Sequence, residues 1–301
     1  MAIKKHFKLI AFYKSLMVLA CLSMALNTGC TTSSFKEASF SKHENVYDQA
    51  YVINLDRTPE RYQTIKEILD KRQLRHKRFS AIDGFNVRLI PLSGGKIISG
   101  ADLWEGRAKL NPQEKYRILC TEVPEQQKYP LYYHYDKRFF SALISAGELG
   151  CLCSHFLIWQ DMVKHNYKVA LIFEDDIMDI STEFLSSLRN IIKHLPEESF
   201  VHLGLVNSNI YKKGDKVILE CKLGEDVKLC EVLSSTRGLG TFAYIINAKM
   251  AQKLLNTSDF HGPVDVTLLN RAMSQEISMH AAFPSFLHIE NNYDQSIIAH
   301  M

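Results

Sequence analysis

The stretch "KVALIFEDDI", residues 168–177, runs from an apolar segment directly into three consecutive carboxylates, Glu174, Asp175 and Asp176. The aliphatic run at 169–173 is typical of a buried strand in a parallel sheet, because both faces of such a strand are covered. The three neighbouring acids repel one another, and no basic residue close in the sequence neutralises them. They therefore need a partner from elsewhere in the fold, from solvent or from a metal ion.

The alternation of side chains along a strand gives the three acids different roles. Glu174 and Asp176 should point to one side and Asp175 to the other. Mg²⁺ and Mn²⁺ prefer oxygen ligands and are commonly held by one or two protein carboxylates together with substrate phosphates. We therefore predict that Asp176, helped by Glu174, contacts a divalent cation, and that Asp175 bonds the backbone or a basic side chain. The competing interpretation is an acidic surface loop that caps the next helix.

The N-terminal part of the chain predicts the beginning of a parallel α/β sheet. Residues 50–55, "AYVINL", form an apolar, β-branched run typical of a buried strand. A helix should follow, with Thr58 as its N-cap and Pro59 at its first position. Residues 76–84, "HKRFSAIDG", then predict a second strand that ends in a turn. This strand–helix–strand order is typical of α/β folds.

Further elements follow the same order after residue 144. Ser145 and Glu148 form a capping box, which places the start of a buried helix at Ala146. After the acidic strand, the patterns predict a helix that is capped by Ser181. Further strands are predicted at 200–204, 216–221, 227–233 and 240–247, with helices at 248–255 and 262–273. The pair at 216–233 is antiparallel, so the predicted class is α/β with a mixed central sheet.

Two segments do not fit this order. Residues 85–144 are rich in glycine, lysine and aromatic residues but lack sustained periodicity, so we expect a surface insertion near the active site. Residues 1–30 carry early lysines, an apolar core at 15–26 and a terminal Gly–Cys pair, the pattern of a secretory signal or lipoprotein leader. An uncleaved membrane anchor is the alternative. Residues 31–46 then predict a polar tether, which leaves 47–301 as the folded domain.

Composition excludes some classes of function. The 301 residues are 46% hydrophobic and 23% charged, with a net charge of +3, and no basic run indicates a nucleic-acid partner. Five cysteines lie outside the leader, without C-x-x-C pairs, which argues against a disulfide framework and a zinc knuckle. Cys151 and Cys153 are expected to be packed thiols. A single disulfide between Cys221 and Cys230 would fit an exported domain.

Four motifs, in the same order and spacing, resemble glycosyltransferase family 25. That group includes the lipooligosaccharide glycosyltransferases of bacteria and the collagen galactosyltransferases of animals. The motifs are "VINLDR" with the arginine four residues beyond it, "DG", "GELGCLCSHFLIW" and "EDD". In this chain they occupy residues 52–61, 83–84, 147–159 and 174–176. The segments at 240–255, 262–269 and 294–298 are also similar to the family.

The resemblance implies a GT-A type, Rossmann-like nucleotide-sugar fold and a metal-dependent, inverting transfer. The expected cofactor is Mn²⁺ or Mg²⁺, and the expected donor is a UDP-sugar, most often UDP-galactose in the family. The acceptor would be a glycan or glycolipid, such as lipopolysaccharide, lipooligosaccharide or another cell-surface glycoconjugate. The chemistry is consistent, because a cation stabilises charge on leaving UDP while a base deprotonates the acceptor hydroxyl.

The resemblance and the residue types together suggest specific roles. Asp176 and Glu174 are the predicted metal ligands. Asn54, Arg57, Arg61 and Asp175 are candidates for binding the nucleotide sugar, although surface pairing with Asp56 and Glu60 would also explain the arginines. His155 is a catalytic candidate, with a satisfied core histidine as the alternative. Asp265 is the candidate general base or an additional metal contact, with helix N-capping as the alternative. Gly238 and Gly240 could let the backbone approach the donor.

The leader conflicts with this function, because nucleotide sugars are made in the cytosol and a bacterial periplasm should lack them. An uncleaved anchor that leaves the domain in the cytosol would resolve the conflict, as would export to a compartment that supplies the donor. We expect membrane association through the N-terminus, with the side of the membrane open. The alternative function is an exported glycan-binding or effector-like protein with little transferase activity. A metal-dependent hydrolase is a third and weaker interpretation.

Overall fold

The computed structural model describes residues 46–121, 126–138, 143–204, 219–223, 228–232, 240–283 and 285–289. The chain divides into two compact units, Met1–Glu44 and Asn45–Met301, and all described residues belong to the second. The predicted leader at 1–30 and almost all of the tether therefore lie outside the described residues. None of the helices in these ranges is long and apolar enough to cross a membrane.

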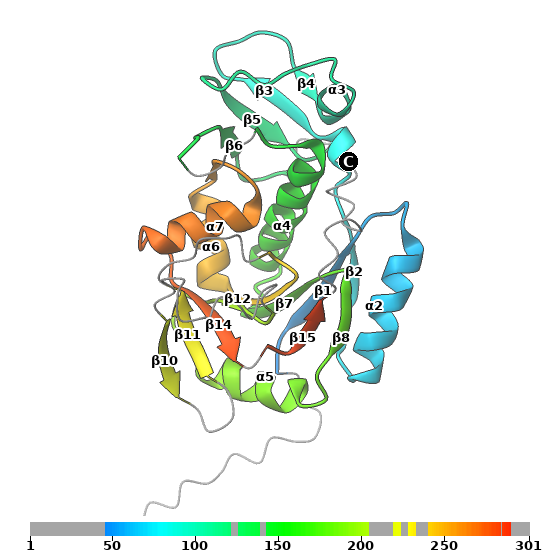
Figure 1. Cartoon of the computed structure of the whole chain (residues 1–301), viewed down its shortest axis with the longest axis vertical. Helices are drawn as coiled ribbons and strands as arrows, with labels where there is room; N and C mark the ends of the chain where they lie inside the picture. The colour runs from blue at the N-terminus through cyan, green and yellow to red at the C-terminus, as the bar shows by residue number, and fades with distance from the viewer. Residues whose placement is uncertain are drawn as a thin grey trace, which may run out of the picture. The chain divides into compact units, whose positions relative to one another are not determined.

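A mixed sheet of eight strands forms the centre of the second unit, as the sequence predicts (Figure 1). β1, β2 and β7 are parallel, so their carboxyl ends lie at one edge of the sheet. β12 is antiparallel to β7 and to β9, and the predicted hairpin forms β10 and β11. In sheet order the strands are β10 (Leu219–Leu223), β11 (Lys228–Val232), β14 (Met279–Phe283), β9 (Phe200–His202), β12 (Ala243–Asn247), β7 (Val169–Glu174), β1 (Gln49–Asn54) and β2 (Lys77–Ser80).

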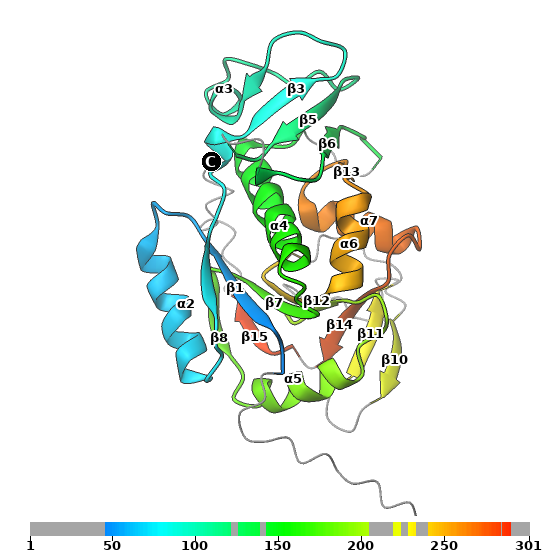
Figure 2. The same ribbon diagram turned by 180° about the vertical axis from the view of Figure 1, so that it is seen from behind.

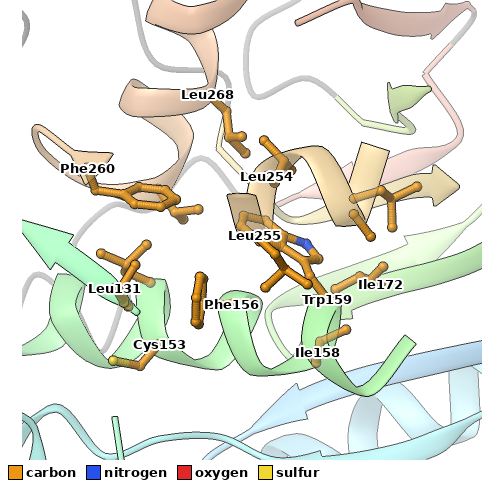
Figure 3. Packing of buried hydrophobic residues seen from close by; sticks show 14 of the residues in the cluster. Leu131, Cys153, Phe156, Ile158, Trp159, Ile172, Leu254, Leu255, Phe260 and Leu268 are labelled. Carbon is orange, nitrogen blue, oxygen red and sulfur yellow. The ribbon is translucent and has the colours of Figure 1, made fainter. Parts of the chain in front are cut away.

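Helices cover both faces of this sheet (Figures 1 and 2). Alternate residues of β1 enter different cores: Tyr51 and Ile53 pack on the side of α4, while Ala50 and Val52 pack on the side of α2 and α5. The first core centres on Trp159 of α4, which is surrounded by leucines of α6 and α7 (Figure 3). Among the described residues, the helices of these two layers are α2 (Pro59–Lys71), α4 (Ala146–Lys164), α5 (Phe184–Lys193), α6 (Ala248–Asn256) and α7 (Val264–Met273).

Two of the three helix starts predicted from capping residues, those of α4 and α5, differ in outcome. At α4, the Ser145 side chain accepts the Glu148 N–H at 3.2 Å and Glu148 accepts the Ser145 N–H at 2.7 Å, so the capping box is confirmed. Ser181 does not begin a helix directly, because α5 starts three residues later at Phe184. The preceding residues instead form strand β8 (Ile177–Ile180), which pairs with β15 (Leu287–Ile289).

Residues 85–144, which lack sustained periodicity in the sequence, contain regular elements among their described residues. They contribute four strands and a helix to a second sheet, which lies above α4 in Figure 1. Its strand order is β13-β6-β5-β3-β4, and β13 comes from a distant part of the chain. The elements are β3 (Arg88–Pro91), β4 (Ile98–Ser99), α3 (Gly100–Trp104), β5 (Lys115–Leu119), β6 (Leu131–His134) and β13 (Asp259–Phe260). The strands are too short to establish a period in the sequence, and their pairing depends on contacts that are not local.

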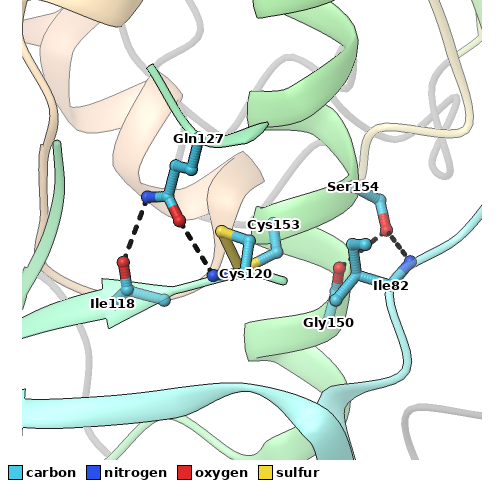
Figure 4. Close-up of a disulfide and its surroundings, with 7 residues drawn as sticks. All are labelled: Ile82, Ile118, Cys120, Gln127, Gly150, Cys153 and Ser154. Atoms are coloured by element: carbon cyan, nitrogen blue, oxygen red, sulfur yellow. Dashed lines mark hydrogen bonds between the residues drawn. A yellow bond between two sulfur atoms is a disulfide. The ribbon is translucent and has the colours of Figure 1, made fainter. Parts of the chain in front are cut away.

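The expectation that Cys153 is a packed thiol is wrong. Cys153 forms a disulfide with Cys120, across a Cα–Cα distance of 5.3 Å, which joins the end of β5 to α4 (Figure 4). Cys151 is free, as predicted. Two residues apart on a helix, the two cysteines point in different directions, and only Cys153 points toward the second sheet. Cys221 and Cys230 are opposite one another in the backbone register of the hairpin, but the structure does not describe their side chains.

Candidate active site

A small pocket, with an accessible volume of about 90 Å³, lies at the carboxyl ends of β1, β2 and β7. The first turns of α4 close its opposite side, through Gly147, Cys151 and His155. All three acids of the "EDD" motif line it, together with Arg61. This is the edge at which open α/β sheets bind their ligands.

Close backbone packing fixes the start of α4 against this edge. The Asp83–Gly84 turn begins the short 3₁₀ helix η1 (Gly84–Asn86), and a Cβ on Gly84 would lie only 1.7 Å from the carbonyl oxygen of Ala146. Ser154 strengthens the contact, because its hydroxyl accepts the Ile82 N–H at 2.9 Å and donates to the Gly150 carbonyl at 2.8 Å (Figure 4). The helix that carries His155 is therefore held rigidly beside β2.

Asp176 has a buried carboxylate oxygen with no protein partner. Its Oδ1 makes no hydrogen bond within the described part of the chain, and its Oδ2 lies 4.0 Å from the Arg61 guanidinium. Burial, with the neighbouring charge of Glu174, raises the pKa of Asp176 to about 7. A buried acceptor of this kind is costly unless a ligand satisfies it. The role of Asp176 as a metal ligand stays a prediction, for which this oxygen offers an available acceptor.

Asp175 joins two of the other predicted binding residues. The strand register pairs Ile53 with Glu174, so Asn54 and Asp175 are the next residues along their strands. The Asn54 amide donates to Asp175 Oδ2 at 2.6 Å, and Arg61 lies 2.5 Å from Asp175 Oδ1. Burial raises the pKa of Asp175, while the Arg61 charge and the Asn54 bond oppose that effect. The prediction that Asp175 bonds a basic side chain is confirmed.

Asn54 is buried, and both the nitrogen and the oxygen of its side-chain amide form hydrogen bonds. Its amide also donates to the carbonyl of Thr58 at 2.9 Å, and its Oδ1 accepts from Arg78 at 2.8 Å. Thr58 occupies the N-cap of α2, as predicted, but its side chain makes no capping bond. Asn54 therefore shapes the turn between β1 and α2 and holds Asp175.

Glu174 is held by two donors on one carboxylate oxygen. Its Oε1 lies 3.2 Å from His155 Nε2, and it also accepts from the Thr241 hydroxyl. Burial would raise the pKa of Glu174, but these two bonds and the charge of Arg61 outweigh it and hold that pKa below its ordinary value. Glu174 is consequently ionised and oriented toward the pocket beside Asp176.

The hydrogen-bond network behind Glu174 assigns the tautomer of His155. The indole N–H of Trp159 donates to Tyr244 Oη at 3.0 Å, and this oxygen lies 2.8 Å from His155 Nδ1. The ionised Glu174 carboxylate is only an acceptor, so Nε2 must donate to it, and in a neutral imidazole Nδ1 then accepts from the Tyr244 hydroxyl. His155 is fully buried, so the geometry favours a positioning role over proton exchange with a substrate.

Cys151, His155 and Glu174 form a second candidate ligand set, which sequence reasoning missed. One ligand atom from each lies within 4.8 Å of the others, which is close enough to hold one metal ion. However, His155 Nε2 is a donor in the tautomer above, and burial raises the pKa of Cys151 well above its ordinary value. The oxygen ligands of Asp176 and Glu174 fit a hard cation better.

Asp265 lies in the first turn of α7 and does not cap the helix, because the N-cap position is Pro263. One of its carboxylate oxygens accepts the Gly240 N–H at 3.3 Å. Burial raises the pKa of Asp265, and the charge of Glu174 adds to this effect. Gly240 has a φ of +65°, a backbone conformation that favours glycine. Gly238 lies outside the described residues.

Arg57 lies at the edge of this group, in an ion pair with Asp83. Asp83 also accepts the Phe85 N–H at 3.1 Å, so one side chain holds both the turn and the arginine. Among the residues not assigned a role from sequence, Thr241 and Tyr244 complete the support of Glu174. The motif at 240–255 contains both, but only the sheet pairing of β12 with β7 brings them to the acids.

This mixed α/β sheet, with carboxylates and an arginine at its carboxyl edge, is the Rossmann-like arrangement of GT-A type glycosyltransferases, and it confirms the predicted fold class. The model of glycosyltransferase family 25 (LPS biosynthesis protein) matches residues 47–268, which is well over half of the sequence. The chain belongs to this family.

Individual relatives are distant. A glycosyltransferase 25 family member of Drosophila pseudoobscura pseudoobscura is 27% identical over 130 residues, 43% of this chain and 16% of its own length. Procollagen galactosyltransferase 1 of Danio rerio is 21% identical over 216 residues, 69% of this chain and 28% of its own. A probable inactive glycosyltransferase 25 family member 3 of Bos taurus is 22% identical over 213 residues, which cover 69% of this chain and 29% of the length of that relative. The chain thus spans less than a third of the length of these relatives.

Proposed function

We propose that this protein is an inverting, metal-dependent glycosyltransferase that moves a hexose from a UDP-sugar to a glycan acceptor. UDP-galactose is the first donor to test, because a procollagen galactosyltransferase is among the relatives. The family description names lipopolysaccharide biosynthesis, so a lipopolysaccharide, lipooligosaccharide or other cell-surface glycoconjugate is the proposed acceptor. The observation that carries the proposal is the buried oxygen of Asp176 at the carboxyl edge of the sheet, which has no hydrogen-bond partner among the described residues.

The carboxylates fit Mn²⁺ or Mg²⁺. Asp176 would hold the cation through the oxygen that lacks a protein partner, and Glu174, fixed by His155 and Thr241, would assist directly or through water. When bound, such an ion supplies positive charge for the diphosphate of the leaving UDP. Asp175 is already paired with Arg61 and so acts as a support.

Two further features of the pocket favour a diphosphate. The Arg61 side chain lines the pocket within reach of both Asp175 and Asp176, and its planar guanidinium suits phosphate oxygens. The N-terminal turns of α4 also face the pocket through Gly147, and a helix N-terminus carries partial positive charge. Asn54 would keep Asp175, and through it Arg61, in place during binding.

Asp265 is the proposed general base. It would take the proton from the acceptor hydroxyl while that oxygen forms a bond to the anomeric carbon and the bond from this carbon to UDP breaks. Attack from the face opposite UDP inverts the configuration. A raised pKa suits a base that works near neutral pH.

The test is a screen of UDP-sugars with the full-length protein in detergent, with release of UDP as the readout. We expect one donor, in the presence of Mn²⁺, to give UDP release that disappears in EDTA. Asp176→Asn should lose the metal-dependent turnover. Asp179→Asn is the control, because Asp179 lies in β8 and pairs with Arg72. If no donor turns over and Asp176→Asn binds UDP as the parent does, the proposal fails.

The second candidate function is glycan binding with little transferase activity, in an exported or effector-like protein. A relative that is described as probably inactive favours it, because the family sequence can persist without turnover. The retained carboxylate cluster counts against it, since a binding module needs no metal ligands. Retention of glycans without any metal-dependent UDP binding would support this second function.

We also propose that residues 1–30 hold the protein at a membrane, through a lipid on Cys30 or an uncleaved anchor. The support is the basic start, apolar core and Gly–Cys pair of the sequence. Metabolic labelling with a fatty acid, in the parent and in Cys30→Ala, separates the two routes. Protease accessibility of the domain in intact cells then gives the side of the membrane.

A further inference from the structure

Three side chains form a stack at the edge of the candidate active site. The guanidinium carbon of Arg57 lies 5.5 Å from the centre of the Phe85 ring. The Phe85 and Trp104 ring centres are 5.9 Å apart, with 58° between the ring planes. Arg57 follows β1, Phe85 belongs to η1 and Trp104 ends α3. The stack therefore joins the central sheet to the second sheet.

The stack is fixed to the border of the pocket. Gly84, the residue before Phe85, lines the pocket, as does Leu55, two residues before Arg57. Asp83 holds both members, because it pairs with Arg57 and accepts the Phe85 N–H. The position of the Phe85 ring is thus set by the same turn that forms the wall of the pocket.

The helix that carries Trp104 is also held close to this turn. A Cβ on Gly100, the first residue of α3, would lie 1.8 Å from the carbonyl oxygen of Gly84. Ser99 caps α3 by accepting the Asp102 N–H at 3.1 Å. Trp104 is therefore presented by a short, capped helix in direct backbone contact with the pocket wall.

Trp104 nevertheless keeps much of its ring exposed. It is 46% exposed, whereas Trp159, the other tryptophan of the chain, is fully buried in the core. Burying an aromatic ring is favourable, and exposed tryptophans at the edge of a site are frequent anchors for ligands. Because Arg57 is already paired with Asp83, the stack offers an apolar face and not a free charge. Such a face suits a neutral ring better than a phosphate.

We propose that Trp104 is a stacking platform for a sugar ring of the acceptor, and that it contributes to acceptor affinity and selectivity. The inference rests on the proposed function, since only a transferase requires an acceptor beside the donor. Pyranose rings present a face of C–H groups that packs on an aromatic ring, while their hydroxyls remain solvated. The rival ligand is the uracil of the donor, which is also a neutral planar ring, and the experiment below distinguishes the two.

The experiment measures retention of the full-length protein on an array of immobilised oligosaccharides, with UDP and Mn²⁺ present. We expect the parent to be retained by a subset of the glycans and Trp104→Ala to lose at least tenfold in apparent affinity for that subset. Trp104→Phe should restore most of the binding, because it keeps an aromatic face. Leu92→Ala is the matched control, since Leu92 follows β3 of the same sheet and is 52% exposed.

Calorimetry with UDP and Mn²⁺ forms the second arm of the experiment. We expect Trp104→Ala to bind UDP as the parent does. Equal glycan retention by the parent and Trp104→Ala would overturn the inference, and so would a parent that is retained by no glycan. A matching loss of UDP affinity in Trp104→Ala would assign the stack to uracil and also overturn it. Absence of metal-dependent UDP binding in the parent is a different result, which refutes the proposed function itself.

Acrylamide quenching of tryptophan fluorescence provides a direct readout at the residue. Trp159 is buried, so the quencher reaches chiefly Trp104. A retained oligosaccharide, taken from the array and added in solution, should protect the parent from quenching, whereas UDP with Mn²⁺ should not. Protection by UDP alone would contradict the inference.

Discussion

At the scale of single residues, Asp176 links stability to function. Its pKa of about 7 lies above the ordinary value of 3.8, so the folded protein holds this proton more tightly than the unfolded chain does. The resulting stabilisation is complete below the unfolded pKa and is lost as pH rises through about 7. The site therefore carries a charge that the fold does not favour, a common cost of a functional site.

This reasoning predicts the effect of Asp176→Asn. At pH 8 the variant should be more stable than the metal-free parent, by on the order of 1–4 kcal/mol, because the buried charge is gone. At pH 5 the difference should be smaller, and it should disappear only below the unfolded pKa of 3.8. Urea unfolding in EDTA at both pH values measures it. If the parent and the variant respond identically to pH, Asp176 does not have a raised pKa.

His155 provides a second prediction, which separates positioning from proton transfer. His155→Ala removes a donor to Glu174 and an acceptor for Tyr244, and leaves a cavity, so we expect a loss of about 2–4 kcal/mol of stability. Without its imidazole donor, Glu174 should ionise at higher pH, so metal-dependent UDP binding should require higher pH.

The control for His155 is a variant that keeps a donor. His155→Gln retains an N–H that can reach Glu174 and should restore much of the metal-dependent UDP binding. A general base would respond differently, because the amide of glutamine cannot take a proton. If His155→Gln binds UDP and metal normally but loses turnover by orders of magnitude, His155 is catalytic.

At the scale of elements, the disulfide joins two parts of the fold that sequence patterns did not connect. Cys120 and Cys153 are 33 residues apart, and closing a loop of that length in the unfolded chain corresponds to about 3–4 kcal/mol. We expect a reducing agent to lower the free energy of unfolding by about this amount. Denaturant unfolding of the parent, with and without dithiothreitol, measures the effect.

Two variants identify the bond responsible. Cys120→Ser combined with Cys153→Ala should be as unstable as the reduced parent and should not respond to dithiothreitol. Cys151→Ser should keep the full response, because Cys151 is free. A parent that is insensitive to reductant would show that the disulfide contributes nothing to stability.

The elements that the sequence predicts well are those with a strong local signal. The capping box of Ser145 and Glu148 fixes the start of α4 to the residue, because both bonds are made within one turn. The "VALIFE" run is recognisable because it is long enough and apolar throughout. Strand β4, in contrast, has two residues, Ile98–Ser99, and exists only because β3 lies beside it. Elements that depend on such distant pairing leave little trace in a sequence read alone.

The candidate site shows the same division. The acids at the end of β7 and the arginine at the start of α2 could be predicted because their positions follow from strand and helix ends. The partners of Glu174 could not, since Thr241 and Tyr244 reach it only through the antiparallel pairing of β12 with β7. The role of His155 also depended on that pairing, because it brings the Tyr244 hydroxyl to 2.8 Å from His155 Nδ1.

At the scale of the whole molecule, the site is assembled from segments far apart in the chain. Arg61, Asp176 and Asp265 come from α2, from the end of β7 and from α7, and the unfolded chain does not hold them together. A ligand that requires all of these segments should therefore bind only the folded state. Such binding raises the stability of the entire domain by mass action.

This linkage predicts how metal and nucleotide affect thermal unfolding. With UDP and Mn²⁺ at about 100 times the dissociation constant, stabilisation should be about 2.7 kcal/mol, which corresponds to about 5–10 °C in Tm for a domain of this size. UDP in EDTA should give little of this shift, because the proposed cation would then be missing between the diphosphate and Asp176. Asp176→Asn should show no shift with either addition, although it starts from a higher Tm at pH 8. An equal shift from UDP with and without metal would place the nucleotide on Arg61 and the α4 N-terminus alone, and would remove the cation from the proposed reaction.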